Sequence, residues 1–253
     1  MGRFALPTTV PAAENNGISD GNCHLTRRET TSLIRKALRV FGVSARRGRH
    51  RSHAYDTIHH GGDFADYFQK TEGMVKYQEA SLLYDLARQT HDGCIVEVGS
   101  YRGRSTVALG RGSLDGHRVP VFAIDPHENY VGIKGGVFGA ADRGAFYQAM
   151  IDTSCYQVVR LINLSSEMVT PRWTQKIGLL WIDGDHTYEG VRRDFECWSP
   201  HLLPDAPIAF DDSQDKDLGP HQLIAELQQN GAYYHADAKG KVTVLKRTQP
   251  AHV

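Results

Sequence analysis

The sequence lacks long hydrophobic runs, closely spaced cysteines and an excess of charge of either sign. Of its 253 residues 40% are hydrophobic, and no apolar run approaches the roughly 20 residues that a membrane-spanning helix needs. The longest apolar stretches, such as Ile177–Ile182, have the length of strands. We therefore expect neither membrane insertion nor a disordered or fibrous chain. The length suits one α/β domain with an extension.

The four cysteines, Cys23, Cys94, Cys155 and Cys197, are isolated from one another. None forms a C-x-x-C pair, which disfavours a zinc ribbon or a redox motif. Cys94 and Cys155 lie in or beside apolar runs, where buried reduced thiols are expected. The segment 1–17 also lacks the apolar core of a secretory signal. Together these features predict a protein of the reducing cytoplasm.

Charged residues are unevenly distributed along the chain, although the formal net charge is zero. Residues 1–60 contain ten Lys and Arg against four acidic residues, and the remainder is acidic by the same margin. Residues 26–41 place apolar side chains at helical spacing, which predicts an amphipathic helix, and a Gly- and Arg-rich linker follows at 42–62. We therefore predict a basic N-terminal segment at 1–60 and one α/β domain at 61–253.

The basic segment could serve as a lid, an arm of a dimer or an anion-binding patch, or it could be a solvated extension. Nucleic-acid binding is disfavoured because no aromatic residues alternate with the charges at 44–51. The apolar face of the predicted helix at 26–41 needs a partner. This partner could be the chain's own α/β domain or a second copy of the chain, and we predict the second copy, in a homodimer.

From about residue 72, short apolar runs alternate with amphipathic stretches. This alternation predicts a Rossmann-like α/β fold, in which helices cover both faces of a mostly parallel seven-stranded sheet that ends in an antiparallel hairpin. The Gly-rich segment 126–150 is predicted to be a long functional or flexible loop. Helices are expected at 78–89, from 105 onward, at 189–198 and at 220–229, and strands at 94–98, 119–124, 157–162, 178–182, 207–210, 232–235 and 241–246.

Three of the five predicted parallel strands are followed directly by an aspartate, namely Asp125, Asp183 and Asp211. A sheet needs no acid at these positions for its stability. Ligands of such sheets bind where the carboxyl ends of the strands meet. The repeated placement of an acid therefore indicates a functional site at this edge.

The turn after the first strand contains Gly99 and Gly103, with the acidic Glu97 before them. Glycines allow a sharp turn and a close approach of backbone to ligand, and the following helix offers free N–H groups. The two glycines are four residues apart, so the G-x-G-x-x-G signature of dinucleotide-binding folds is absent. The turn predicts a small-molecule ligand but not NAD.

The pattern E-x-G-x-x-x-G from Glu97 resembles motif I of the class I S-adenosylmethionine-dependent methyltransferases. The segment I-D-G-D-H-x-Y-E-G at 182–190 resembles small-molecule O-methyltransferases of the macrocin and mycinamicin type, the methyltransferase domain 24 family. The resemblance covers roughly 70–247. It implies that Asp125 bonds the ribose hydroxyls of S-adenosylmethionine. The residues implied to bind the cofactor are Glu97, Gly99, Ser100, Tyr101, Gly103, Ser105, Asp125, Ser165, Ser166 and Met74.

In metal-dependent members of this family, acids after the fourth and fifth strands hold Mg²⁺, and the resemblance places Asp183, Asp211 and Asp212 in this role. Three converging carboxylates would repel one another without a cation, and oxygen ligands suit Mg²⁺. His186 corresponds to the base of sugar-modifying relatives and is predicted to act beside Asp183. Asp185 remains an alternative as ligand or base. Candidate acceptor contacts are Asp185, Tyr130, Lys134 and Tyr188.

These residues together predict Mg²⁺-dependent transfer of a methyl group from S-adenosylmethionine to a hydroxyl of a sugar or glycoside, such as a mannoside or a methylmannose oligosaccharide. Histidine, which can accept a proton near neutral pH, suits the weakly acidic hydroxyl of a sugar. A catechol-like or other natural-product hydroxyl is an alternative acceptor. An NAD-binding oxidoreductase is a second alternative, disfavoured by the incomplete glycine signature. A non-catalytic binding protein and a nucleic-acid methyltransferase are weaker alternatives.

Overall fold

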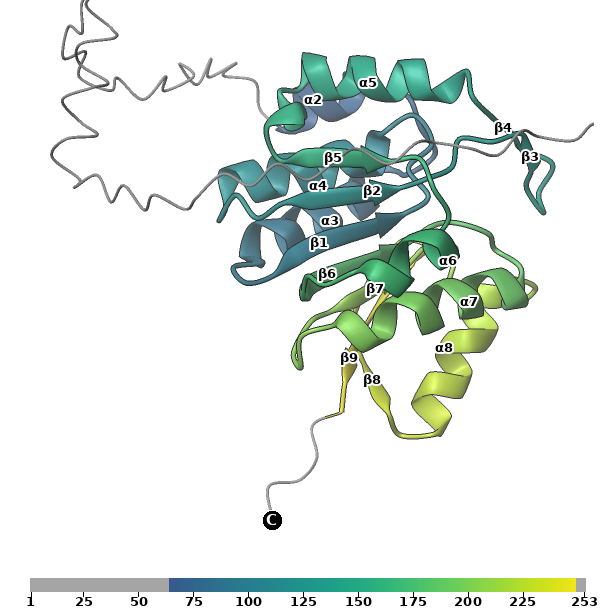
Figure 1. The fold of residues 1–253 in the computed structure, drawn as a ribbon. Coiled ribbons are helices and arrows are strands. Elements are labelled where there is room, and N and C mark those ends of the chain that lie inside the picture. The colour runs from purple at the N-terminus through teal and green to yellow at the C-terminus, as the bar shows by residue number, and fades with distance from the viewer. Residues whose placement is uncertain (1–63, 249–253) are drawn as a thin grey trace, which may run out of the picture. The chain divides into compact units, whose positions relative to one another are not determined.

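A computed structural model describes residues 64–248 (Figure 1). The predictions for the basic segment at 1–60, including its helix at 26–41, lie outside the described residues. The linker predicted at 42–62 and Cys23 lie outside them as well.

The described part of the chain contains a seven-stranded sheet of the predicted kind. Its first strand in sequence, β1, lies in the middle of the sheet, and the chain builds outward on one side before it crosses to the other. The topological switch point therefore lies between β1 and β6, where ligands of such sheets bind. The order is β5 (Val159–Ile162), β2 (Val121–Ile124), β1 (Cys94–Val98), β6 (Ile177–Ile182), β7 (Ile208–Phe210), β9 (Val242–Arg247) and β8 (Tyr233–Lys239), of which the first five are parallel.

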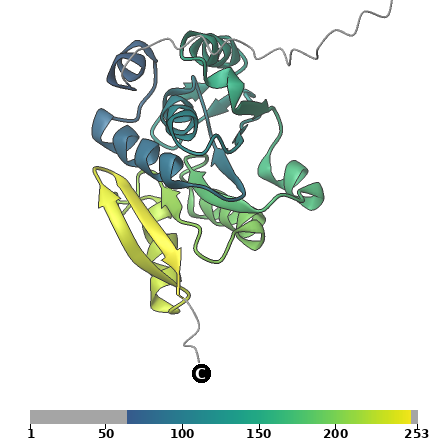
Figure 2. The ribbon, with the colours of Figure 1, turned by 90° about the vertical axis from the view of Figure 1, so that its left-hand side faces the viewer.

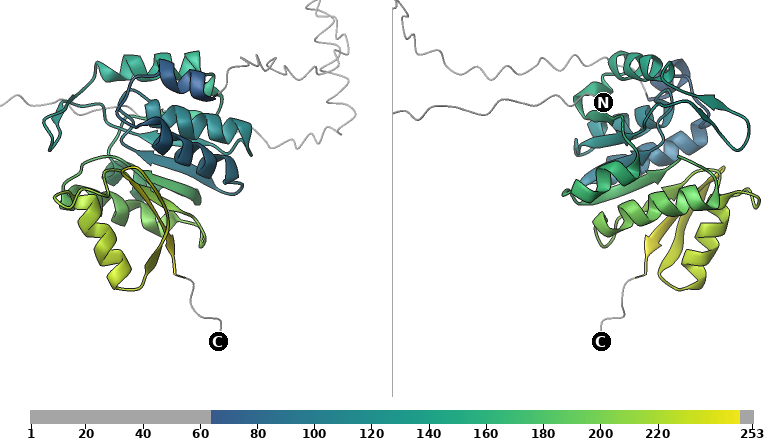
Figure 3. Two further views of the ribbon diagram at one scale, coloured as in Figure 1. Left: turned by 180° about the vertical axis from the view of Figure 1, so that it is seen from behind. Right: turned by 45° about the vertical axis from the view of Figure 1, so that its right-hand side comes forward.

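Alternate residues of the strands point to two separate hydrophobic cores, one on each face of the sheet. In β6, for example, Leu179 and Trp181 belong to one core, whereas Leu180 and Ile182 belong to the other. Both faces are therefore covered, as predicted, and the carboxyl ends of the strands remain available for a site. One face is covered by α2 (Phe64–Lys70), α3 (Tyr77–Gln89), α4 (Arg104–Asp115) and α5 (Asp142–Asp152), the other by α6 (Ser166–Val169), α7 (Tyr188–Trp198) and α8 (Gly219–Gln229), with short 3₁₀ helices at Cys155–Gln157, Thr170–Arg172 and Ser199–His201 (Figures 1 and 3).

The segment 126–150 is not the single long loop that its glycines predict. It forms a small antiparallel hairpin, β3 (Tyr130–Val131) and β4 (Val137–Phe138), and most of helix α5. The buried side chains of α5 are Asp142, Phe146 and Met150, spaced by four residues. A single row of this kind is narrower than the apolar stripe of an ordinary amphipathic helix, so periodicity does not reveal it.

The C-terminal hairpin also differs from its prediction in the position of its turn. The sequence predicts that residues 237–240 connect the strands, but β8 continues to Lys239, with an irregularity of register between His235 and Asp237. The turn is formed by Gly240, at φ +60°, and Lys241. An edge strand tolerates outward-facing polar residues, which resemble turn residues in the sequence. Figure 2 shows this hairpin in yellow at the edge of the sheet, and β9 pairs with β7 there.

In the described part of the chain, no helix is long and apolar enough to cross a membrane. Cys94 and Cys155 are buried free thiols, as predicted from their apolar surroundings, and Cys197 is half-buried and also free.

Candidate functional site

A cavity of about 550 Å³ opens at the carboxyl ends of β1, β2, β6 and β7. It brings together most of the residues that the sequence singles out. Three predicted residues do not line it: Glu97, Gly103 and Tyr188. Those that do line it are Met74, Gly99, Ser100, Tyr101, Ser105, Asp125, Tyr130, Lys134, Ser165, Ser166, Asp183, Asp185, His186, Asp211 and Asp212.

Asp125 fixes the glycine turn that follows β1. Its Oδ2 accepts hydrogen bonds from the backbone N–H groups of Ser100 (2.8 Å) and Tyr101 (2.9 Å), and its Oδ1 accepts one from the N–H of His127 (2.8 Å). Gly99 has φ +82°, and a Cβ there would lie 2.2 Å from the carbonyl oxygen of Asp183. The hydroxyl of Ser100 also donates to Oδ2 (3.2 Å), so the remaining acceptor capacity of Asp125 lies on Oδ1, which can still accept a hydroxyl group from the cavity.

Glu97 holds helix α4 against β1 instead of facing the cavity. It is fully buried, and the hydroxyls of Ser105 and Thr106 each donate to it at 2.6 Å. Burial raises the pKa of Glu97 to about 8, in spite of the two hydroxyl donors that lower it. Gly103, the N-cap of α4 at φ +90°, lies against Phe146 and Met150. Both residues therefore shape the turn from behind.

The raised pKa of Glu97 predicts a dependence of stability on pH. The folded protein binds a proton more tightly than the unfolded chain, so this contribution is complete below the ordinary pKa of 4.5 and is lost as the pH rises toward about 8. In the wild type, Glu97 is expected to make the free energy of unfolding fall by up to ~1.4 kcal/mol for each pH unit in this range. Glu97→Gln is expected to remove this contribution, so its free energy of unfolding falls less steeply with pH. Urea denaturation between pH 5.5 and 8.5 measures this slope. The exposed Glu189→Gln is the control, and an unchanged slope in Glu97→Gln would contradict the expectation.

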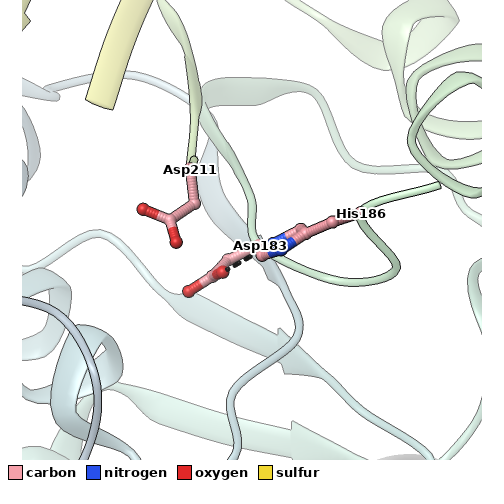
Figure 4. A group of neighbouring side chains, drawn as sticks. All are labelled: Asp183, His186 and Asp211. Atoms are coloured by element: carbon pink, nitrogen blue, oxygen red, sulfur yellow. Dashed lines mark hydrogen bonds and ion pairs between the residues drawn. The ribbon is translucent and has the colours of Figure 1, made fainter. Parts of the chain in front are cut away.

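Three aspartates, Asp183, Asp211 and Asp212, surround His186, and these four residues are called the acidic cluster. Figure 4 shows Asp183, His186 and Asp211. Nε2 of His186 lies 3.3 Å from Asp183 Oδ1, and Nδ1 lies 3.3 Å from Asp212 Oδ2. Burial lowers the pKa of His186, but the two carboxylates outweigh it and raise this pKa to about 10. The hydrogen bond from His186 lowers the pKa of Asp212. In this arrangement the imidazole is protonated at neutral pH.

Three members of the acidic cluster fit a divalent cation. Asp183, His186 and Asp211 each offer a ligand atom, and these atoms lie within 4.8 Å of one another. The side chain of Asp211 is only 2% exposed, and its Oδ1 has no hydrogen-bond partner in the described part of the chain. A buried carboxylate oxygen without a partner is costly, and a cation would satisfy it.

Asp212, predicted as a ligand, lies outside this group of three. Its Oδ2 contacts His186 and Lys134, and its Oδ1 lies 3.3 Å from Nζ of Lys241. Both of its oxygens are thus occupied by positively charged side chains. Of the three predicted ligands, Asp183 and Asp211 therefore fall in this group, together with His186, and Asp212 lies beside it.

The β3–β4 hairpin covers one side of the cavity. The hydroxyl of Tyr130 donates to Asp185 Oδ1 (3.0 Å), and Lys134 lies within 3.3 Å of Asp212. Asp185 also accepts from the N–H and hydroxyl of Thr187, the N-cap of α7, which leaves it little capacity as a base. Tyr188 instead donates to Glu226, on α8. Tyr130, Lys134 and Asp185 therefore meet at the cavity, and Tyr188 does not.

The remaining predicted cofactor residues, Ser165, Ser166 and Met74, also line the cavity. Ser166 is buried, and its hydroxyl accepts from the indole N–H of Trp198 (2.9 Å). Ser165 is the N-cap of the short helix α6. Met74 is 61% exposed at the rim.

Two residues of the site, His127 and Lys241, are not predicted from the sequence. His127 is buried beside Asp125. One of its ring nitrogens lies 2.7 Å from the carbonyl of Tyr101 and the other 3.0 Å from the amide nitrogen of Asn163, which fixes the glycine turn a second time. Lys241 reaches the acidic cluster from the C-terminal hairpin. Neither lies in a recognisable motif; the strand register alone could have placed Lys241 beside β7.

A family model described as a methyltransferase domain matches residues 96–213. Among curated proteins, an uncharacterized protein of Sinorhizobium fredii, y4gI, is 27% identical over 143 residues, which cover 53% of this chain. The chain spans only 15% of the length of that relative.

Solved methyltransferase structures share the fold at low sequence identity. The S-adenosylhomocysteine-bound methyltransferase PaMTH1 of Podospora anserina matches with a TM-score of 0.56 and 14% identity, over 90% of this chain and all of that one. An O-methyltransferase of Bacillus cereus in complex with S-adenosylhomocysteine matches with a TM-score of 0.53 and 14% identity, over 75% and 94%. TomG of Streptomyces achromogenes, an O-methyltransferase of tomaymycin synthesis in complex with S-adenosylmethionine, matches with a TM-score of 0.52 and 15% identity, over 74% and 86%.

Proposed function

We propose that the chain is an S-adenosylmethionine-dependent methyltransferase that methylates a hydroxyl of a small molecule in the cavity described above. The match of a methyltransferase family model to residues 96–213 and the Rossmann-like fold shared with solved O-methyltransferases support this proposal. One observation carries the proposal. A single cavity joins the glycine turn after β1, the acid after β2 and the acidic cluster after β6 and β7. The first two suit the methyl donor, and the third suits the activation of an oxygen nucleophile.

The cofactor is proposed to lie across the carboxyl ends of β1 and β2. The backbone at Gly99 approaches the cavity without a side chain, and the N-terminus of α4 would favour an anionic group of the cofactor there. Asp125 is held by three backbone N–H groups and is available to the ribose hydroxyls. The methyl group of S-adenosylmethionine is already activated, so the protein's main task is to orient it toward the acceptor.

We propose that Asp183 and Asp211 hold a divalent cation, Mg²⁺ in particular, beside His186. When bound, such a cation supplies positive charge that stabilises a developing alkoxide. His186 remains the proposed base, although Asp183 and Asp212 hold a proton on its ring in the arrangement described here. Compensation of these carboxylates by positive charge lowers the pKa of His186 and frees a ring nitrogen to accept the proton of the acceptor.

The acceptor is proposed to be a sugar or glycoside, such as a mannoside or a methylmannose oligosaccharide. Carboxylate and hydroxyl groups of Asp185 and Tyr130 line the part of the cavity next to the acidic cluster, and they suit a polar acceptor with several hydroxyls. A catechol-like or other natural-product acceptor is a second candidate. The apolar side chains of Ile133 and Phe138, which line the same region, favour it.

Calorimetric titration of S-adenosylhomocysteine into the wild-type protein tests the assignment. We expect binding at one site per chain, with and without Mg²⁺, because the proposed cofactor contacts do not include the cation. Methyl transfer to a panel of mannosides, other sugars and catechols is expected to stop in EDTA and to resume with Mg²⁺. Failure of the folded protein to bind S-adenosylhomocysteine, together with binding of NAD, would instead support the oxidoreductase alternative. Full activity in EDTA would exclude the cation.

A further inference from the structure

Lys241 places a positive charge inside the acidic cluster, from a part of the chain that the family match at 96–213 does not include. Its side chain is 26% exposed. Nζ lies 2.5 Å from Asp211 Oδ2 and 3.3 Å from Asp212 Oδ1. The residue lies at the turn between β8 and β9, and β9 pairs with β7. This pairing brings the start of β9 next to the carboxyl end of β7, where the two acids follow.

The backbone of Lys241 is held independently of its side chain. Its N–H donates to Glu79 Oε1 on α3 (3.1 Å), and its carbonyl accepts from the N–H and hydroxyl of Ser213 (3.0 and 2.8 Å). The preceding Gly240 packs so closely against Glu79 that a Cβ there would lie 2.4 Å from its carboxylate. The turn is therefore a rigid support for the ammonium group, and a substitution of the side chain leaves its backbone contacts in place.

The contacts of Lys241 make the two neighbouring acids unequal. Asp211 uses Oδ2 for the ammonium and leaves Oδ1 buried and without a partner in the described part of the chain. Asp212 has no such free oxygen, because Lys241 contacts one oxygen while His186 and Lys134 contact the other.

Given the cation site of the proposed function, we propose that Lys241 is a positioning residue that selects Asp211 Oδ1 as the ligand oxygen of the pair and keeps Asp212 from ligating the metal. The ammonium of Lys241 and the divalent cation bind the same carboxylates and therefore lie close together. Because both are positively charged, the ammonium repels the cation. The wild-type site is therefore tuned to weaker metal binding than its acids alone would give.

Removal of this charge is expected to tighten metal binding. We expect Lys241→Met to bind Mn²⁺, an oxygen-preferring probe for Mg²⁺, at least about 10-fold more tightly than the wild type, a difference of ~1.4 kcal/mol. Lys241→Arg, which keeps the charge, is expected to stay within about 3-fold of the wild type. Calorimetric titration of Mn²⁺ into the full chain measures both, with Lys239→Met, an exposed neighbour on β8, as the matched control.

The two acids provide a second arm of the test. Asp212→Asn is expected to retain Mn²⁺ binding, whereas Asp211→Asn is expected to lose it. If Lys241→Met binds Mn²⁺ no more tightly than the wild type does, the proposed role of Lys241 is overturned. The same holds if neither protein binds Mn²⁺. Loss of binding in Asp212→Asn would overturn it as well. Binding of S-adenosylhomocysteine by the same samples separates this failure from a failure of the proposed function, because it does not depend on the metal.

Discussion

Asp125→Ala is expected to weaken the binding of S-adenosylhomocysteine by at least about 100-fold. Two losses add up in this variant. The carboxylate that would bond the ribose hydroxyls disappears, and so do the acceptors for the N–H groups of Ser100, Tyr101 and His127. A hydrogen bond to a charged group is worth about 1.5–3 kcal/mol, so two such bonds exceed the ~2.7 kcal/mol that 100-fold represents. Isothermal titration calorimetry measures the change.

A second acid in the same cavity makes this test specific. Glu128 also lines the cavity, three residues after Asp125, but it is exposed. Glu128→Ala is expected to change the affinity for S-adenosylhomocysteine by no more than about 3-fold, and Asp66→Ala, exposed on α2, not at all. Tight binding by Asp125→Ala together with loss in Glu128→Ala would move the ribose contact to Glu128. The melting temperature of each variant shows whether a loss reflects unfolding.

The sheet and its reactive edge could be predicted from the sequence because both are recorded locally. Each parallel strand is a short apolar run, since both faces of the sheet are covered. The acid after each of β2, β6 and β7 then has to lie at the same edge, which the cavity confirms for Asp125, Asp183 and Asp211. The strand order, with β1 at the centre of the sheet, is the usual one for doubly wound sheets.

The features that sequence analysis missed depend on contacts between distant segments. Lys241 reaches Asp211 only because β9 is antiparallel to β7 and because the turn lies at Gly240, two facts of register that composition does not encode. Glu97 belongs to a motif of cofactor-binding proteins, yet each of its carboxylate oxygens accepts a hydrogen bond from a hydroxyl of α4, that of Ser105 or Thr106. A motif thus locates a turn in the chain, whereas burial decides which of its side chains meet the ligand.

Asp183→Asn is expected to lower the rate of methyl transfer by about 1000-fold while leaving the affinity for S-adenosylhomocysteine within about 3-fold of the wild type. Asp183 takes part in both proposed functions of the acidic cluster, cation binding and proton transfer. It offers a ligand atom beside Asp211, and its Oδ1 lies 3.3 Å from Nε2 of His186. The substitution preserves its volume but removes its charge. Loss of a cation that stabilises an alkoxide costs several kcal/mol, and ~4 kcal/mol corresponds to about 1000-fold. Single-turnover methyl transfer and calorimetric titration of S-adenosylhomocysteine measure the two effects, and Mn²⁺ titration shows the loss of the cation.

Asp185, two residues further along the same turn, is the matched control for Asp183. Its oxygens bond Thr187 and Tyr130, and Asp185 is not among the three ligand residues. Asp185→Asn is therefore expected to keep Mn²⁺ affinity and to raise KM for the acceptor, by up to about 10-fold, through the loosened β3–β4 hairpin. A larger loss of kcat in Asp185→Asn than in Asp183→Asn would assign the base or ligand role to Asp185. Equal, small losses in both variants would show that methyl transfer needs only the orientation of donor and acceptor, a role that the cavity walls alone could fulfil.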